Sequence, residues 1–334
     1  MRSINQTAGV SDRVADPPSW RAAGNRFFAH NLHLRNEFGH RVQKVSVDAG
    51  MTCPNIDGRV ATGGCIYCNR RSFSPSRRHS VGSIAAQIEA GIGRLRRRYR
   101  CDHFIAYFQP ATNTYAPVER LESIFQEALR VPRIVGLAIG TRPDCVPPPV
   151  LDLIERLGRQ TYVSVEYGMQ TIDDRLLNWI NRGHDHRSFV DAVMRSHNRG
   201  FRVCAHVILG LPDQSLEDVR STARELARLD LDGVKIHNLH AVRDTRLADL
   251  VRNGSLVLMS QGDYVRAVIE LLEWLPPHCV VERLSGDAPP EYLVGPHWCL
   301  DKRAVRAAIE AELENRRTWQ SRRFTTGQIS PEPQ

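Results

Sequence analysis

Short apolar runs alternate with amphipathic stretches along most of this 334-residue chain. Such alternation predicts consecutive βα units and a parallel sheet with right-handed crossovers. The runs are nearly continuous in apolar residues, which is typical of strands covered on both faces. Six strands are expected, at residues 44–49, 104–109, 134–140, 162–166, 203–209 and 234–239.

The stretches between these runs have the periodicity of helices. In the first of them, Ile84, Ile88 and Ile92 fall on one face, as an amphipathic helix requires. In the last, Ser215 and Asp218 have the spacing of a capping box. Helices are therefore expected at 83–98, 117–129, 150–157, 187–198 and 215–229.

Six βα units are too few for a closed eight-stranded barrel. We therefore predict an α/β fold, a partial (β/α)6 TIM-type barrel that is open on one side, with a C-terminal α/β extension. A seventh strand at 280–284 and a last helix at 301–317 would belong to that extension. A doubly wound open sheet is the alternative, but no Gly-x-Gly-x-x-Gly turn follows any predicted strand.

The chain divides into four parts on this interpretation. Residues 1–35 and 325–334 lack periodicity and are expected to be disordered. Residues 36–275 form the barrel core, and residues 276–324 form the extension packed on it.

Three cysteines, Cys53, Cys65 and Cys68, follow the first predicted strand. Eleven residues separate the first two, and two separate the second pair. A Cys-x-x-Cys pair with one further thiolate nearby is typical of a bound metal or iron–sulfur cluster. Because a closed [4Fe–4S] centre takes four cysteines, three would leave one iron open to another ligand.

A structural zinc site with His79 as the fourth ligand is the alternative for the same cysteines. The Gly63-Gly64 turn, Tyr67 between the paired cysteines and the position after a strand favour the cluster.

The cysteines also help to predict the cellular compartment of the protein. The chain shows no apolar run of signal-peptide length near residue 1 and none that could span a bilayer. We therefore expect a cytoplasmic protein with reduced thiols and no membrane partner. Cys101, Cys145, Cys204 and Cys279 are expected to be buried small hydrophobic residues, and Cys299 is left open.

The net charge of +8 comes largely from arginine, for example in the run from Arg96 to Arg100. Such an excess favours a polyanionic partner, with nucleic acid first. Solvated arginine faces on an ordinary basic protein explain the charge equally well.

Several motifs together resemble the radical SAM superfamily, and within it the branch that contains the catalytic subunit of Elongator. Thr141-Arg142-Pro143-Asp144 is similar to that branch's Glu-Thr-Arg-Pro-Asp, and Glu166-Tyr-Gly-Met-Gln170 to its Glu-Leu-Gly-Val-Gln. Asn181-Arg182-Gly183-His184 matches its Asn-Arg-Gly-His. The short bacterial YhcC-like family is more similar still, through residues 107–117 and 298–302.

The chain departs from these patterns in two places. The usual superfamily spacing has three residues between the first two cysteines, where this chain has eleven. Gly140 stands where the Elongator branch has an acidic residue. The resemblance covers roughly residues 40–260, so an acetyl-transfer step is not implied.

The resemblance implies two cofactors, a [4Fe–4S] cluster on the three cysteines and S-adenosylmethionine on the open iron. Reductive cleavage of S-adenosylmethionine would give a 5′-deoxyadenosyl radical that abstracts hydrogen from a substrate. The implied partners are an electron donor such as flavodoxin or ferredoxin and, by analogy with Elongator, tRNA modified at a wobble uridine.

The resemblance also implies roles for polar residues at the strand ends. Arg182 would hold the carboxylate of S-adenosylmethionine, and an ion pair with Asp185 is the alternative role for its side chain. His206 and Lys235 are candidate catalytic residues, and a core histidine and a surface lysine are their alternatives. The remaining candidate cofactor ligands are Tyr67, Thr112, Asn113, Glu166 and Gln170.

Two other functions are compatible with the same residues. One is a radical enzyme that acts on a small metabolite or a protein. The other is a non-catalytic RNA-binding module in which the cysteine loop is a structural metal site.

Overall fold

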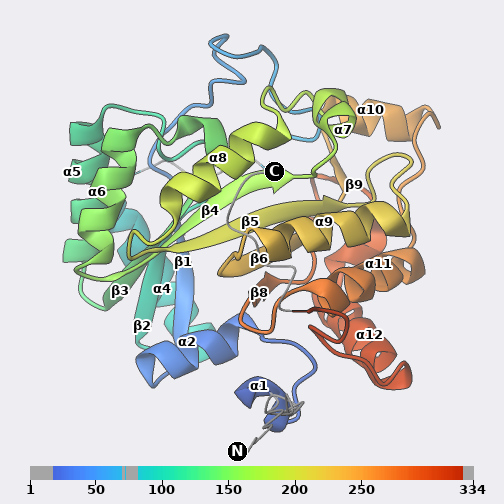
Figure 1. Ribbon diagram of the computed structural model, residues 1–334. Helices are drawn as coiled ribbons and strands as arrows, with labels where there is room; N and C mark the ends of the chain where they lie inside the picture. Colours follow the sequence, from blue (N-terminus) through green and yellow to red (C-terminus); the bar gives the residue numbers. More distant parts are fainter. Residues whose placement is uncertain (1–17, 70–71, 73–81, 326–334) are drawn as a thin grey trace, which may run out of the picture.

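A seven-stranded parallel sheet forms the centre of the computed structural model, which describes residues 18–69, 72 and 82–325. The strand order is β1-β2-β3-β4-β5-β6-β8, so β1 and β8 are the two edges of an open half-barrel (Figure 1). This confirms the predicted partial barrel. The strands are β1 (Val42–Val47), β2 (His103–Phe108), β3 (Ile134–Thr141), β4 (Tyr162–Gln170), β5 (Arg202–Leu209), β6 (Gly233–Asn238) and β8 (Val280–Arg283).

Helices connect consecutive strands and pack on the outer face of the sheet, as right-handed βα crossovers require (Figure 1). The connecting helices are α4 (Ile84–Tyr99), α5 (Val118–Arg130), α6 (Pro148–Gly158), α7 (Asp174–Trp179), α8 (His186–Ser196) and α9 (Leu216–Arg228). Ser215 and Asp218 form the predicted capping box at the start of α9.

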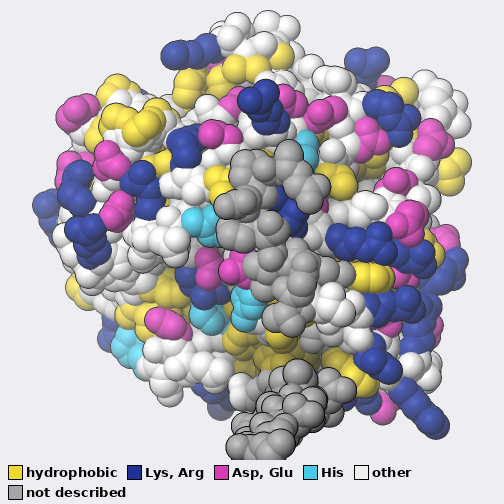
Figure 2. Space-filling view, in the orientation of Figure 1, with side chains coloured by type: hydrophobic (Ala, Val, Ile, Leu, Met, Phe, Trp, Pro, Cys, Tyr) yellow, Lys and Arg dark blue, Asp and Glu magenta, His cyan; other side chains and the backbone are white. Residues whose placement is uncertain are grey.

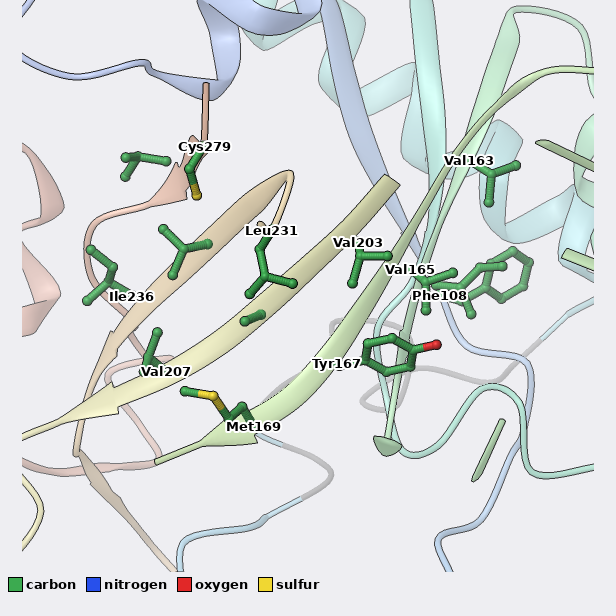
Figure 3. Close-up of a cluster of buried hydrophobic side chains, with 14 of the residues drawn as sticks. Phe108, Val163, Val165, Tyr167, Met169, Val203, Val207, Leu231, Ile236 and Cys279 are labelled. Carbon is green, nitrogen blue, oxygen red and sulfur yellow. The ribbon is translucent and has the colours of Figure 1, made fainter. Parts of the chain in front are cut away.

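Side chains alternate across the sheet, and β4 shows this clearly. Val163, Val165 and Tyr167 point toward the outer helices and belong to the main hydrophobic core (Figure 3). Glu166 and Gln170 point the other way and line the inside of the half-barrel. Because successive strand residues face opposite sides, each strand supplies apolar groups to the core and polar groups to the interior.

The C-terminal extension completes the sheet. Its strand β8 pairs with β6, so the seventh strand expected at 280–284 is present. Helix α11 (Gln261–Trp274) packs against α9, and α12 (Lys302–Asn315) packs on α11. The remaining elements are α10 (Arg246–Arg252), a small sheet of β7 (Ala241–Val242) with β9 (Leu293–Gly295), and short 3-10 helices at Pro143–Cys145 and His297–Leu300.

Residues 18–35, which we expected to be disordered, are folded instead. They contain α1 (Ser19–Ala22) and the start of α2 (His30–Phe38). Trp20 is buried and its indole Nε1 donates to the Pro277 carbonyl at 2.8 Å, while the Val281 amide donates to the Phe28 carbonyl at 2.8 Å. These contacts are with the C-terminal extension, so local periodicity gave no sign of them.

All eight cysteines are free thiols, and the five outside the cysteine loop are buried, Cys299 among them. Among the helices of the described residues, none combines the length and the hydropathy needed to cross a membrane.

Candidate cofactor site

The loop after β1 carries the three cysteines across the carboxyl ends of the strands (the blue loop at the top of Figure 1). All three cysteines line one cavity of about 780 Å³. Polar groups from the strand ends line the same cavity, as expected where parallel strands end at one edge. Besides the cysteines, the candidates that line it are Tyr67, Thr112, Glu166, Gln170, Arg182 and His206.

A tight turn brings the paired cysteines together, because the Cys68 amide donates to the Cys65 carbonyl at 2.9 Å. Two donors point at the Cys65 sulfur: Asn55 Nδ2 at 3.5 Å and Arg182 Nη1 at 3.7 Å. Donors of this kind stabilise a thiolate, which is the form of cysteine that binds a metal.

Three thiols opening onto one cavity fit a cluster that is held on one side by the protein. Among the described residues, no three His, Cys, Asp or Glu side chains are close enough to hold a single metal ion. His79, the fourth ligand of the zinc alternative, lies outside the described residues.

The Asn-Arg-Gly-His motif after α7 holds the cysteine loop in place. Asn181 Nδ2 donates to the carbonyls of Gly64 at 2.7 Å and Thr62 at 3.2 Å. In return, Asn55 Nδ2 donates to the Asn181 carbonyl at 2.6 Å. The motif and the loop are more than 100 residues apart in sequence, and these bonds fix their relative position.

The Thr-Arg-Pro-Asp motif holds the Asn-Arg-Gly-His motif in position. Arg142 is fully buried and makes two parallel bonds to the Asp144 carboxylate, at 2.9 and 2.8 Å. Its third bond, from Nη1 to the Arg182 carbonyl at 2.7 Å, ties the two motifs together. Asp144 is therefore occupied by Arg142, and the pair positions the backbone beside the cysteines.

The guanidinium of Arg182 lies beside Cys65 and makes no ion pair with Asp185. Asp185 instead caps α8 by accepting from the Ser188 amide at 2.9 Å. Arg182 donates to the Gly168 carbonyl at 2.8 Å and to His184 at 2.9 Å. With the bond to Cys65, these use three of the five N–H donors of a guanidinium, which leaves two for a bound carboxylate.

Glu166 sits at the floor of the cavity in a buried ionic network with Lys44, Lys235, His206 and Glu282. It accepts from Lys44 at 2.8 Å, from His206 at 3.0 Å and from Lys235. Lys44 also bonds Glu282 at 2.6 Å. The Glu166 side chain is 0% exposed, so its carboxylate is stabilised by these partners rather than by water.

The electrostatics of the network follow from this arrangement. Burial by itself would raise the pKa of Glu166, but Lys235 and Lys44 outweigh it and hold the pKa well below its usual range. Burial lowers the pKa of His206 against the opposing effect of Glu166, so its ring is neutral near pH 7.

Two candidates lie outside the cavity lining. Lys235 is only 4% exposed and does not line the cavity, but it bonds Glu166, which does, and this makes it a positioning residue for that carboxylate. Asn113 is buried and donates to the carbonyls of Phe108 at 3.0 Å and Gly140 at 2.9 Å, so it joins the ends of β2 and β3. An added Cβ at Gly140 would lie only 3.2 Å from the Phe108 carbonyl oxygen.

Lys44, Glu282 and Arg283 also belong to this site, although they were not among the residues predicted from the sequence. Val45 and Val47 of the first strand pack in the main core, so the alternation along the strand places Lys44 on the inner face and could have identified it. Glu282 and Arg283 gave no such signal, because the pairing of β8 with β6 is irregular between them.

Comparison with known proteins identifies the family of the chain. Residues 56–226 match the Radical SAM superfamily, and residues 231–315 match the Radical_SAM C-terminal domain. YtqA of Bacillus subtilis is 40% identical over 299 residues, which cover 90% of this chain and 93% of YtqA. YhcC of Escherichia coli K12 is 37% identical, over 80% of this chain and 85% of YhcC.

Elongator is a more distant relative. Human Elongator complex protein 3 is 27% identical over 218 residues, which cover 63% of this chain and 39% of that protein. The solved structure of Methanocaldococcus infernus Elp3 superposes with a TM-score of 0.62 at 19% identity, over 84% of this chain and 64% of that one. This superposition shows that the two chains share a fold.

The chain thus belongs to the radical SAM superfamily and is an enzyme of that class. Within the superfamily it is similar to YtqA and YhcC, and less so to Elongator complex protein 3. The family's cofactors are a [4Fe–4S] cluster and S-adenosylmethionine, which together supply a carbon-centred radical when an external donor provides the electron.

The residues of this chain fit those cofactors. The three cysteines would hold the cluster, with Asn55 and Arg182 donating to the Cys65 sulfur. The two remaining donors of Arg182 would hold a carboxylate, and Tyr67 lines the cavity beside the cysteines. The half-barrel wall would exclude water from the reacting atoms.

Proposed function

We propose that the substrate of this radical SAM enzyme is tRNA, and that the reaction begins with hydrogen abstraction at a wobble uridine. The observation that carries the proposal is that the Elongator-like motifs all converge on the cysteine loop. Arg142, Asn181 and Arg182 are joined to one another and to that loop by hydrogen bonds.

A basic helix end supports an RNA substrate. Arg98, from the arginine-rich end of α4, is among the residues that line the cavity. Arg97 and Arg100 lie at the same helix end, which leads into the start of β2, and they make no ion pair within the described part of the chain, so they are available to phosphates.

The other basic region adds little to this support. Lys and Arg side chains gather on the flank that carries α11 and α12 (Figures 1 and 2). Some of this charge is already paired, since Arg306 bonds Glu310 within α12 and Arg316, just after α12, bonds Glu312. We therefore assign RNA contact to the α4 end.

Radical SAM chemistry needs an electron donor, and we propose a flavodoxin or ferredoxin for this role. Eight free cysteines are typical of a reducing compartment, so we place the reaction in the cytoplasm.

Two experiments test the tRNA proposal. Nucleosides from the tRNA of a deletion strain are analysed by mass spectrometry, and loss of a wobble-uridine modification is expected. In vitro, addition of total tRNA to the reconstituted enzyme should increase 5′-deoxyadenosine formation. An unchanged nucleoside profile together with no effect of tRNA would refute the proposal and leave a small metabolite or a protein as the substrate.

A variant set separates RNA contact from chemistry. Changing both Arg97 and Arg100 to Gln should weaken tRNA binding and reduce its salt dependence, because each phosphate contact contributes to both. Arg303, an exposed arginine on α12, supplies the control Arg303→Gln, which should bind tRNA like the unchanged enzyme.

A further inference from the structure

Arg283 enters the cavity because of an irregularity in the last strand of the sheet. Along β6 and β8, Val234 pairs with Val281, but the next residue, Lys235, pairs with Arg283. Glu282 is passed over, so two consecutive residues of β8 lie opposite Lys235. Such a bulge re-aims side chains. Here Glu282 joins the ionic network and Arg283 lines the cavity.

The Arg283 guanidinium has no carboxylate partner among the described residues, although it is half-buried. Both acidic neighbours in sequence are occupied elsewhere. Glu282 binds Lys44 at 2.6 Å and Lys235 at 3.6 Å, and Asp287 binds Lys302 at 2.6 Å. A guanidinium left unpaired in a cavity wall favours an anionic ligand.

The charge balance inside the half-barrel also favours an anionic ligand beside Arg283. Lys44 and Lys235 are matched by Glu166 and Glu282, each lysine lying against both carboxylates. Arg283 is therefore the excess cation of this group, and the two carboxylates beside it do not neutralise its charge.

Two histidines, His206 and His237, lie in the same part of the cavity wall as Arg283. His237 lines the cavity, its ring lies 5.2 Å from that of His206, and its buried Nε2 has no hydrogen-bond partner in the described part of the chain. Gly286 leaves room beside it, because an added Cβ there would come 3.1 Å from His237 Nδ1. A neutral imidazole has one N–H to donate, which suits an oxyanion held by Arg283.

We infer that Arg283 and His237 bind an oxyanion of the substrate at this wall of the cavity. The inference rests on the proposed function for the identity of that group, which would be a phosphate of the reacting RNA nucleotide. Arginine suits this role because its planar donors match the oxygens of phosphate or carboxylate two at a time. The carboxylate of S-adenosylmethionine is the other source of an oxyanion in this cavity.

Equilibrium binding to the reconstituted enzyme tests the inference, with uridine 5′-monophosphate, uridine and inorganic phosphate as probes and S-adenosylmethionine present. The enzyme should bind uridine 5′-monophosphate about tenfold more tightly than uridine, the worth of one charge-assisted contact. Arg283→Gln should remove this preference and leave uridine binding unchanged. Arg283→Lys should restore part of it, since it keeps the charge without the paired donors.

The control is again Arg303→Gln, which should keep the full preference. Thermal unfolding of each variant checks that the fold is retained. If Arg283→Gln does not fold, the reduced preference of Arg283→Lys provides the same comparison.

Equal affinity of the unchanged enzyme for the two uridine compounds would overturn the inference, as would a preference that survives in Arg283→Gln. A tenfold loss of S-adenosylmethionine binding with the preference intact would assign Arg283 to the cofactor carboxylate and overturn it too. Phosphate binding that depends on Arg283, combined with an unchanged tRNA profile, would keep this site and refute only the tRNA proposal.

Discussion

Removing the charge of Glu166 is expected to destabilise the fold strongly. The Glu166 side chain is 0% exposed, and those of Lys235 and Lys44 are 4% and 16% exposed. Glu166→Gln would leave both lysines to share Glu282. Breaking a buried pair in this way costs about 3–5 kcal/mol.

This magnitude can be converted into a thermal shift. An unfolding entropy of about 2.1 cal/mol/K per residue, over 334 residues, gives about 0.7 kcal/mol/K. Glu166→Gln should therefore lower the midpoint of thermal unfolding by roughly 4–7 °C. Differential scanning calorimetry at one scan rate measures the shift for the enzyme and the variant side by side.

An exposed pair provides the matched control. Arg306 and Glu310 are 51% and 44% exposed, so Glu310→Gln should lower the midpoint by only about 1 °C. The double variant Glu166→Gln with Lys235→Met should recover part of the loss, because it leaves Lys44 and Glu282 as a balanced pair. A Glu166→Gln midpoint equal to that of Glu310→Gln would refute the network's role.

Two further predictions concern single positions. Burial lowers the pKa of His30 to about 3 from 6.5, so its contribution to stability is complete above pH 6.5 and is lost as the pH falls toward 3. Between pH 7 and 5 the enzyme should lose roughly 2 kcal/mol of stability through His30. In urea unfolding, the His30→Phe variant should therefore lose about 2 kcal/mol less than the enzyme over this range, and an unchanged pH profile would contradict this. At Gly168 an added Cβ would lie 2.4 Å from Arg182 Nη2, so Gly168→Ala should weaken S-adenosylmethionine binding about tenfold in a titration. Gly93→Ala on α4, where a Cβ meets nothing within 4 Å, is its control, and equal binding by both variants would remove Arg182 from the cofactor site.

Local patterns were sufficient to predict the barrel and the position of the cysteine loop. Strand β5 was expected at 203–209 and is Arg202–Leu209, because its outward residues form a run of apolar side chains. Polar residues after such runs must meet at one edge of a parallel sheet, and Glu166 and Gln170 line one cavity there together with His206.

What the sequence did not reveal depends on contacts between distant segments. Trp20 is held by the Pro277 carbonyl, a partner 257 residues away, and no local pattern anticipates such a bond. The Arg283 side chain points into the cavity because of the register of β8 against β6. The sequence of one strand alone does not determine that register. Lys235 lies on the predicted inner face, yet it is bonded to Glu166 and does not line the cavity.

The central claim is that three cysteines hold a [4Fe–4S] cluster with one iron open to S-adenosylmethionine. The most direct measurement is 5′-deoxyadenosine, quantified by mass spectrometry after anaerobic reconstitution and reduction with dithionite. We expect four irons per chain and 5′-deoxyadenosine from the enzyme and from Cys101→Ala, and no 5′-deoxyadenosine from Cys65→Ala. Bound zinc without 5′-deoxyadenosine, or activity that persists in Cys65→Ala, would contradict it.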